Sequence, residues 1–594
     1  QELRFELPTP PAQASDLRLV ASARGGAVWF DDFDLQFLRP SQPLVRVFVN
    51  QIGYGLQGPK SAVIATNFFP SDSPTVRWEL RGEGCQSTDQ RTLTCSGRIH
   101  SGTPDDWGWY FWRADFSSFQ RPGTYTAMAL AMAKPGMTVR GESAPFLVQP
   151  NVLVDQTASL GVDFFFVQRC GFAVPGWHAA CHLDDARLPD GTHLDATGGW
   201  HSAGDYNKPM YVFGDSAAVY ALAVVFDEYD NKLAQFDRNH DGIPDALDEA
   251  WWGAKFLAKM QNPDDGSLRG DVNQGPDREW MRWTAPDVHT DNTIGTADDP
   301  VIRQPVGSTP LAVAGWTRLA GLLNDRKISN DYLERALRLW RYYTSRDGAI
   351  GNSLLFLGAL ELHRATGEDQ FKDFADQSVD AFLKAQRSDG SYSGDSGDHG
   401  DWTAAALALY GLQYSDDQRD ERVRASLTKY LEFCLSRADN PFGLTLQGPA
   451  GDEPVFFHPS VGLGVNFWIL GRAWAAALIH QLTGDQRAQA YAIDQIDWVF
   501  GKNPVNLCMF EGRGVFNPPR YHHRYNMIPG RERGAVPGAI ANGFVSDMGI
   551  ADRPGFDLST GGSRSPSYRT SEPWLVHNIV HLLAVSALLS EDGQ

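Results

Sequence analysis

The sequence lacks an excess of positive charge, and this absence argues against nucleic acid as a partner. Its 594 residues include 52 lysines and arginines against 72 aspartates and glutamates, which gives a formal net charge of −20 at pH 7. A surface this negative repels phosphate backbones. A neutral polymer such as a glycan meets no such repulsion, and the 18 tryptophans suit the apolar faces of sugar rings. Solubility alone explains the charge equally well.

Long apolar runs are also missing. No stretch approaches the ~20 apolar residues that cross a bilayer, and no signal-peptide core is present, so we expect no membrane partner. The first residue is Gln1 and not methionine, which indicates a processed or cut chain. Export from the cell is compatible with these features, and we expect a secreted protein.

Cysteine is scarce. Six cysteines in a chain of this length are too few for a disulfide scaffold. Cys85 and Cys95 bracket a short polar loop and could close a hairpin by a disulfide. Cys434 and Cys508 lie in apolar stretches, which predicts buried thiols.

The first part of the chain reads as β structure. Short alternating or β-branched runs, separated by Gly, Pro and Asp, are typical of a sandwich. Examples are residues 46–51, 61–67 and 124–132. We therefore expect a β-sandwich over 46–150. Residues 1–45 form a separate segment, and its stretch 25–35 is similar to the last strand of a carbohydrate-binding module.

After about residue 152 the periodicity becomes helical. The clearest helical stretches are 216–229, 331–343, 354–367, 403–414, 467–484 and 573–589. Two of them end alike, at Gly367 and Gly484, where glycine stops one helix before the next begins. Repeated helix pairs joined by long loops predict a mainly α domain over 151–594, built as an α/α barrel with its cleft formed by loops.

A set of two thiols and two imidazoles predicts a zinc site. Together they supply a complete tetrahedral ligand set, with no position left for a reacting water, so the site would be structural. The four residues are Cys170, Cys181, His182 and His201. The alternative is two buried cysteines and two unrelated histidines.

A loop with regularly spaced oxygen ligands predicts a calcium site. Side-chain oxygens fall at loop positions one, three and five, glycine stands at six, a backbone carbonyl at seven and a carboxylate at twelve. The predicted ligands are Asp237, Asn239, Asp241, Ile243 and Asp248. Position twelve is aspartate and not the usual glutamate. The alternative is a solvated turn before a helix.

Two carboxylates are candidates for acid–base chemistry. Asp205 lies in a glycine-flanked loop between a tryptophan and a tyrosine, although loop aspartates mostly form turns. Glu572 lies in an aromatic-rich stretch just before a helix, where desolvation would raise its pKa as a general acid requires. First-turn placement against the helix dipole explains Glu572 as well.

Together these motifs resemble glycoside hydrolase family 9, in the branch with an N-terminal immunoglobulin-like domain. The resemblance runs from about residue 46 to 590. It is carried by VNQIGY, GGWHSAGDY, GIPDALDE with a helix ending in KMQ, GKNPVN, PRYHHR and SEPWLVHN, in that order. It implies an (α/α)6 barrel and hydrolysis of a β-1,4-glucan with inversion, and it agrees with the zinc ligands, since such a site recurs in this branch.

The resemblance also implies roles for individual residues. Asp205 corresponds to the catalytic base and Glu572 to the acid. His522, Arg524 and Tyr568 correspond to substrate-contacting positions. Candidate sugar-stacking platforms are Trp280, Trp283 and Trp402, although most tryptophans in such a barrel belong to its core.

One position departs from the family. Its catalytic loop usually carries two aspartates, and Ser202 stands in place of the first. Serine can bind the attacking water but cannot share its charge, so we expect the reaction to be retained with altered rate, pH profile or substrate range.

The sequence leaves three functions open. The first is an endo-acting β-1,4-glucanase on cellulose or a related β-glucan, acting as a monomer and without an organic cofactor. The second is an exo-acting β-glucosidase or glucosaminidase on oligosaccharides. The third is a catalytically weak glycan-binding protein, with Ser202 as the mark of lost activity. Retention of both carboxylates favours an enzyme.

Overall fold

A computed structural model describes residues 42–589 with gaps. The gaps are 71–74, 83–90, 95–96, 99–106, 108, 211–213, 273–281, 303, 305, 393–399, 416–417, 449–454, 458–461, 547–551 and 562–564. Most of the predicted N-terminal segment, the pair Cys85 and Cys95, and Trp280 lie outside the described residues. Cys434 and Cys508 are buried thiols, as predicted.

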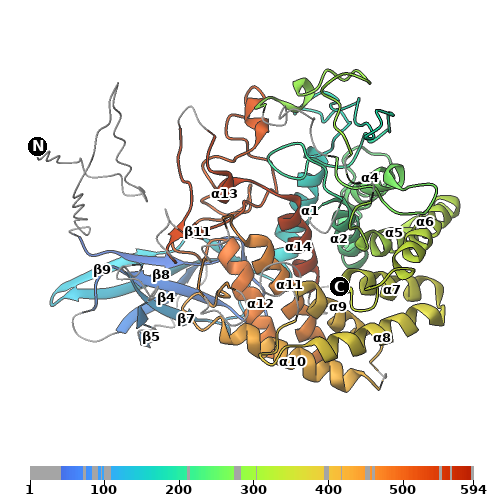
Figure 1. The fold of residues 1–594 in the computed structure, drawn as a ribbon. Helices are drawn as coiled ribbons and strands as arrows, with labels where there is room; N and C mark the ends of the chain where they lie inside the picture. The colour runs from blue at the N-terminus through green and yellow to red at the C-terminus, as the bar shows by residue number, and fades with distance from the viewer. Residues whose placement is uncertain are drawn as a thin grey trace, which may run out of the picture. The chain divides into compact units, whose positions relative to one another are not determined.

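The first described part of the chain is a sandwich of two β-sheets (Figure 1). One sheet has the order β1-β3-β7-β6, and the other has the order β2-β10-β8-β4-β5, with β9 paired to β8. The strands are β1 (Val45–Phe48), β2 (Gly53–Tyr54), β3 (Ser61–Thr66), β4 (Thr75–Gly82), β5 (Arg91–Thr94), β6 (Gly97–Arg98), β7 (Tyr110–Asp115), β8 (Gly123–Lys134), β9 (Met137–Glu142) and β10 (Phe146–Val148). Apolar side chains from both sheets, including Ile64, Trp78 and Trp112, fill the space between them.

The remaining chain is helical, and its inner helices close into a ring. Each inner helix packs against the next, and the last packs back against the first. In ring order these are α2 (Asp215–Glu228), α5 (Leu311–Leu322), α7 (Ser353–Thr366), α9 (Gly400–Gln413), α11 (Asn466–Thr483) and α14 (Leu575–Ser586). Their side chains are buried nearly all round, as in α14, because both faces of an inner helix meet protein.

A second layer of helices covers the ring. These helices bury one face and expose the other, as α6 and α8 do, so they are amphipathic. They are α1 (Val152–Val167), α4 (Asp245–Met260), α6 (Arg326–Thr344), α8 (Asp369–Ala385), α10 (Asp420–Ser436) and α12 (Gln486–Val499). Within the described residues the two layers make an (α/α)6 barrel, which confirms the predicted fold class.

Short elements lie in the loops. They are α3 (Asp230–Leu233), 3-10 helices at Pro286–Val288 and Arg524–Met527, β11 (Val545–Ser546), β12 (Pro554–Gly555) and α13 (Tyr568–Ser571). The predicted glycine stops are confirmed: Gly367 and Gly484 end α7 and α11 with φ of 69° and 74°, in the left-handed region that glycine adopts without strain. No helix in the described ranges is long and apolar enough to cross a membrane.

The sandwich contacts the barrel through charged side chains, most of them buried, which we call the sandwich–barrel charge cluster. It consists of Arg113 from β7, Asp494 and Asp497 from α12, and Lys502. Lys502 Nζ lies 2.5 Å from Asp494 and 2.9 Å from Asp497, and Arg113 lies 2.7 Å from Asp494. Asn50 donates a further hydrogen bond of 2.9 Å to Asp497.

Candidate active site

Three segments that are far apart in the sequence meet through their backbones. The Arg524 N–H donates to the Gly204 carbonyl at 3.0 Å, and the Leu575 N–H donates to the Ser202 carbonyl at 2.8 Å. A Cβ at Gly204 would lie 1.9 Å from the His522 carbonyl oxygen, so only glycine allows this approach. The contacts bring the loops around residues 202–207, 522–524 and 571–575 together.

Glu572 is buried and lies beside Asp205. Only 8% of Glu572 is exposed. Burial first, and then the negative charge of Asp205, raise the pKa of Glu572 to about 8, whereas the Gly204 N–H opposes this rise by a hydrogen bond. Glu572 is therefore protonated at neutral pH and able to donate a proton.

Asp205 is half-buried and held by its own loop. Its two carboxylate oxygens accept hydrogen bonds from the backbone and side-chain amides of Asn207, at 3.1 and 2.8 Å. Burial raises the pKa of Asp205, while the positive charge of Arg524 and the Asn207 hydrogen bond act in the opposite direction. Burial thus raises the pKa of both acids, and Glu572 keeps its proton at neutral pH because the charge of Asp205 raises its pKa further, to about 8.

His522 stands between aromatic rings at this site. Its Nδ1 lies 2.8 Å from the Pro566 carbonyl oxygen, which only accepts, so Nδ1 carries the proton and Nε2 is the acceptor. Burial lowers the pKa of His522, which keeps the ring neutral. Trp283 and Tyr568 meet this ring edge-on, with centroid distances of 4.7 and 5.7 Å.

The candidate sugar platforms separate into different environments. Trp283 is half-buried, and its indole N–H donates to Asn526 at 2.8 Å. Tyr568 is 51% exposed and therefore accessible. Trp402, in contrast, is only 4% exposed and packs against Trp474 in the core at 4.9 Å. Its position favours a packing role, and we do not retain it as a platform.

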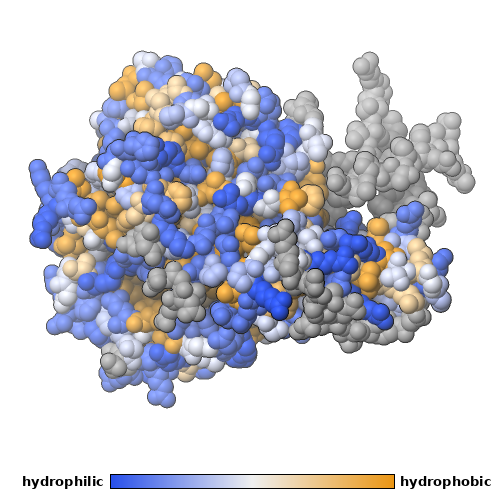
Figure 2. All heavy atoms as spheres, turned by 180° about the vertical axis from the view of Figure 1, so that it is seen from behind, coloured by the Kyte–Doolittle hydropathy of each residue, from blue (hydrophilic) through white to orange (hydrophobic). Residues whose placement is uncertain are grey.

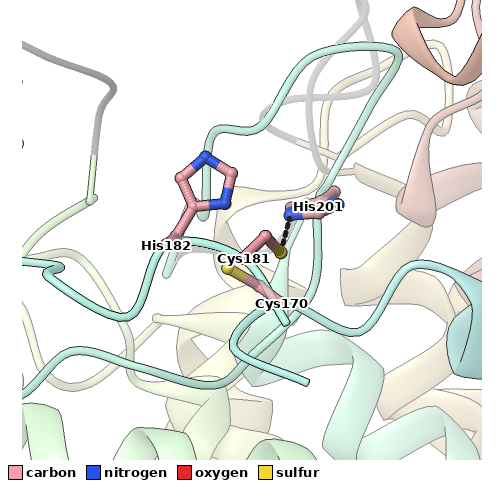
Figure 3. Close-up of side chains that lie close together, drawn as sticks. All are labelled: Cys170, Cys181, His182 and His201. Carbon is pink, nitrogen blue, oxygen red and sulfur yellow. Dashed lines mark hydrogen bonds between the residues drawn. The ribbon is translucent and has the colours of Figure 1, made fainter. Parts of the chain in front are cut away.

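The four predicted zinc ligands form one buried cluster (Figure 3). One ligand atom from each of Cys170, Cys181, His182 and His201 lies within 4.8 Å of all the others. Cys181 Sγ and His201 Nε2 are 3.6 Å apart. Sulfur and nitrogen ligands of a tetrahedral Zn²⁺ are also about 3.6 Å apart, given their usual bond lengths. The donor set and spacing therefore fit a metal ion.

In His201 and His182, one ring nitrogen contacts a neighbouring side chain, and the other ring nitrogen is available to bind a metal. His201 Nδ1 lies 3.0 Å from the Tyr525 hydroxyl, so its Nε2 faces the thiols. His182 Nε2 lies 3.2 Å from His289, and its buried Nδ1 has no hydrogen-bond partner among the described residues. Such outer partners fix the ring orientation of metal-binding histidines.

This cluster is joined to the catalytic loop. His201 directly precedes Ser202 and is four residues before Asp205. Tyr525, which contacts His201, directly follows Arg524. A metal bound here would fix the backbone that precedes Asp205 and, through Tyr525, the segment that carries Arg524.

The predicted calcium loop has the turn geometry of such a site. Asp237 accepts hydrogen bonds from the backbone of Asp241 and Gly242, at 3.2 and 3.0 Å. Gly242 has a φ of 84°, which suits glycine. Asp248 forms an ion pair of 2.7 Å with Arg169, so it is the weakest of the five predicted ligands.

Several residues of the site were missed by the sequence analysis. Asn207 holds Asp205, Gly204 allows the loops to meet, and Tyr525 orients His201. Tyr206 also packs against His201, with ring centroids 4.7 Å apart. The dense glycine, aromatic and amide composition of residues 198–208 was the available signal, but it does not assign a partner to any of these side chains.

Comparison with known families gives two matches. The model described as "Glycosyl hydrolase family 9" matches residues 155–555, and the model described as "Cellulase N-terminal ig-like domain" matches residues 42–130. The first match covers more than half of the chain and coincides with the barrel. The second match coincides with the sandwich.

Individual relatives are distant in sequence. The chain is 26% identical to endoglucanase C of Cellulomonas fimi, over 85% of this chain and 48% of the relative. It is 24% identical to a cellulose 1,4-β-cellobiosidase of Acetivibrio thermocellus, over 84% of this chain and 62% of the relative. It thus spans less than two thirds of either protein.

A solved structure shares the fold. The zinc-binding triple mutant of family 9 endoglucanase J30 superposes with a TM-score of 0.66 at 21% identity, covering 91% of this chain and 100% of that chain. At this identity the likeness concerns the fold.

Proposed function

Because this chain belongs to glycosyl hydrolase family 9, we propose that it hydrolyses β-1,4-glucosidic bonds in cellulose or a related β-glucan, as an endo-acting and inverting enzyme. The observation that carries the proposal is the pairing of Glu572 with Asp205. Their charges interact, and the pKa of Glu572 is raised to about 8 by burial and by Asp205. One acid is thereby protonated at the pH at which the other can act as a base.

In the proposed reaction Asp205 takes a proton from water while the water attacks the anomeric carbon. Glu572 donates its proton to the glycosidic oxygen, the bond to the leaving sugar breaks, and the configuration inverts. Inverting enzymes place the two carboxyl groups about 6.5–9.5 Å apart so that the water fits between them. Asn207 positions Asp205 by two hydrogen bonds, and Arg524 favours its charged form.

The substrate would lie against the aromatic group around His522. Its Nε2, as an acceptor, suits a sugar hydroxyl. Trp283 and Tyr568 flank the His522 ring and offer apolar surface to a sugar face. Ser202 would bind the attacking water by its hydroxyl group.

We propose Zn²⁺ as the ion of the cysteine–histidine cluster. Four protein ligands leave no open position, so its part is structural. The zinc-binding triple mutant of endoglucanase J30, which shares this fold, supports this choice. A Cys181→Ser variant should contain about one zinc less per chain by elemental analysis and should lose activity, because His201 holds the backbone next to Ser202. Unchanged zinc content would contradict the assignment.

We propose Ca²⁺ for the loop of Asp237, Asn239, Asp241 and Ile243, with Asp248 as the twelfth position. The side-chain oxygens and Gly242 support it. If Asp248 keeps its ion pair with Arg169, a water molecule supplies the ligand at position twelve.

The remaining proposals concern the whole protein. We divide it into an N-terminal segment (1–45), an immunoglobulin-like sandwich (46–150) and the catalytic barrel (151–594). A polymeric substrate is too large to enter a cell, which supports secretion. We also propose a monomer; on the one face that Figure 2 shows, groups of apolar residues are interspersed with hydrophilic ones.

Product analysis tests the function. The chain is incubated with cello-, mixed-linkage, xylo- and chito-oligosaccharides, and with carboxymethylcellulose. Endo action predicts a rapid fall in viscosity and mixed oligosaccharides of inverted anomeric form. Monosaccharide alone would indicate the exo-acting alternative, whereas binding without release of reducing ends would indicate a glycan-binding protein.

A further inference from the structure

A second group of acidic side chains lies outside the sites described so far. One carboxylate oxygen from each of Asp184, Asp291 and Asp298 lies within 4.8 Å of the others. Ligand oxygens of Ca²⁺ lie 2.3–2.6 Å from the ion, so two of them are at most about 5.2 Å apart. The three oxygens are thus close enough to share one ion.

Asp184 itself indicates a missing partner. It is 0% exposed, and neither of its carboxylate oxygens makes a hydrogen bond of standard geometry with the described residues, although its own backbone N–H and the Thr290 hydroxyl lie near enough to oppose the rise of its pKa by burial. A buried carboxylate without a partner is costly, because water no longer solvates its charge. By contrast, Asp298 accepts a hydrogen bond of 2.8 Å from the Asp291 backbone, and Asp291 accepts one of 2.7 Å from Thr293.

The local charge is strongly negative. Asp299, also buried, acts on Asp184 by its charge, as Asp298 does. Arg282 acts on Asp298 by its positive charge. One guanidinium does not neutralise this many carboxylates, and a divalent cation would balance their charge.

We propose that Asp184, Asp291 and Asp298 bind one calcium ion. All three ligands are hard oxygen donors, which suit Ca²⁺ and not Zn²⁺, and backbone carbonyls and water complete the coordination. The ion would join the turn at 290–299 to the loop that carries His182. These two segments already touch, since the Leu183 N–H donates to Asn292 at 2.9 Å and His289 lies 3.2 Å from His182.

The test measures calcium directly. After dialysis against calcium-free buffer, the intact chain is titrated with Ca²⁺ by calorimetry, and its calcium content is measured at saturation. An Asp291→Asn/Asp298→Asn variant should bind one calcium fewer per chain, or bind it at least about tenfold more weakly. Asp237→Asn, in the separate loop, should leave this binding event unchanged.

Asp190→Asn is the matched control. Asp190 is exposed and accepts a hydrogen bond from the backbone of Thr192, as Asp291 does from Thr293. It should bind calcium like the unmodified chain. Equal calcium content and affinity in the double variant and the control would overturn the proposal.

An Asp184→Asn variant distinguishes two explanations for the burial of Asp184: a calcium ligand, or a carboxyl group that is buried in its protonated, neutral form. Loss of one bound calcium supports the site. Unchanged calcium binding together with a higher melting temperature would show that Asp184 is a neutral buried acid, and would also overturn the proposal.

Discussion

The sandwich–barrel charge cluster and the proposed catalytic pair both lie largely out of solvent, but only the first has balanced charges. Arg113 and Lys502 face Asp494 and Asp497, two cations against two anions. Their charges outweigh burial and lower the pKa of Asp494. At the site, by contrast, Arg524 alone acts on both Asp205 and Glu572.

This difference in charge balance distinguishes the structural role of the sandwich–barrel charge cluster from the proposed catalytic role of Asp205 and Glu572. The balanced cluster favours the charged form of Asp494, although burial raises the pKa of Asp497, and it joins two parts of the fold. At the site, burial first and then the negative charge of Asp205 keep a proton on Glu572. That retained proton is what acid catalysis requires.

The largest effect is expected from removing either catalytic carboxyl group. Asp205→Asn and Glu572→Gln should each lower kcat by about 10²–10⁴-fold, the usual contribution of a general base or acid. Release of reducing ends from β-glucan measures this, with circular dichroism to confirm that each variant is folded. Near-normal activity of Asp205→Asn would refute the base assignment.

A substitution in the sandwich–barrel charge cluster should lower the stability of the protein and leave its activity nearly unchanged. Lys502→Met leaves Asp494 and Asp497 without their shared partner and should lower the free energy of unfolding by about 3–5 kcal/mol. Chemical denaturation measures the loss. Activity per folded molecule, measured well below the unfolding transition, should stay within about twofold. If activity fell as far as in Asp205→Asn, the cluster would have a catalytic part and the distinction would fail.

The dependence of activity on pH should reflect the protonation of Asp205 and Glu572. Activity needs Asp205 ionised and Glu572 protonated, so it should fall on the acidic side as Asp205 gains a proton. It should fall on the alkaline side above about pH 8, where Glu572 loses its proton.

Arg524→Met sharpens this test. Arg524 lowers the pKa of both acids, so both limbs of kcat/KM against pH should move to higher pH, by about 1 pH unit. Limbs that stay in place while activity falls would show that Arg524 only binds substrate.

The smallest effect is expected at Ser202. Ser202→Asp restores the second acid of the family loop and adds a negative charge beside the pair. It should raise the pKa of Asp205 and move the acidic limb to higher pH, with a gain in kcat of less than about tenfold. Ser202→Ala is the control and should lower kcat without moving the limb. An identical profile in all three proteins would show that this position does not contact the water.

Much of the fold follows from local rules. The predicted helix at 216–229 is α2, and the one at 467–484 is α11. The strand expected at 61–67 is β3. The predicted stops at Gly367 and Gly484 are correct because the left-handed conformation at a helix end depends on one residue and its neighbours.

Side chains of the same type, however, take different environments that no local pattern distinguishes. Trp283 lies beside His522, whereas Trp402 lies in the core against Trp474. Asp248 has the spacing of a calcium ligand but pairs with Arg169, which comes from a distant part of the chain.

The sequence by itself determined the helix and strand order, the family resemblance and the set of thiols and imidazoles suited to a metal. These depend on residue type and spacing. Only the tertiary structure decided that Glu572 lies beside Asp205, that Asn207 and Arg524 favour the charge on Asp205, and that burial keeps a proton on Glu572. A pKa depends on every charge and on the solvent around a group, and those are fixed only when distant segments have packed together.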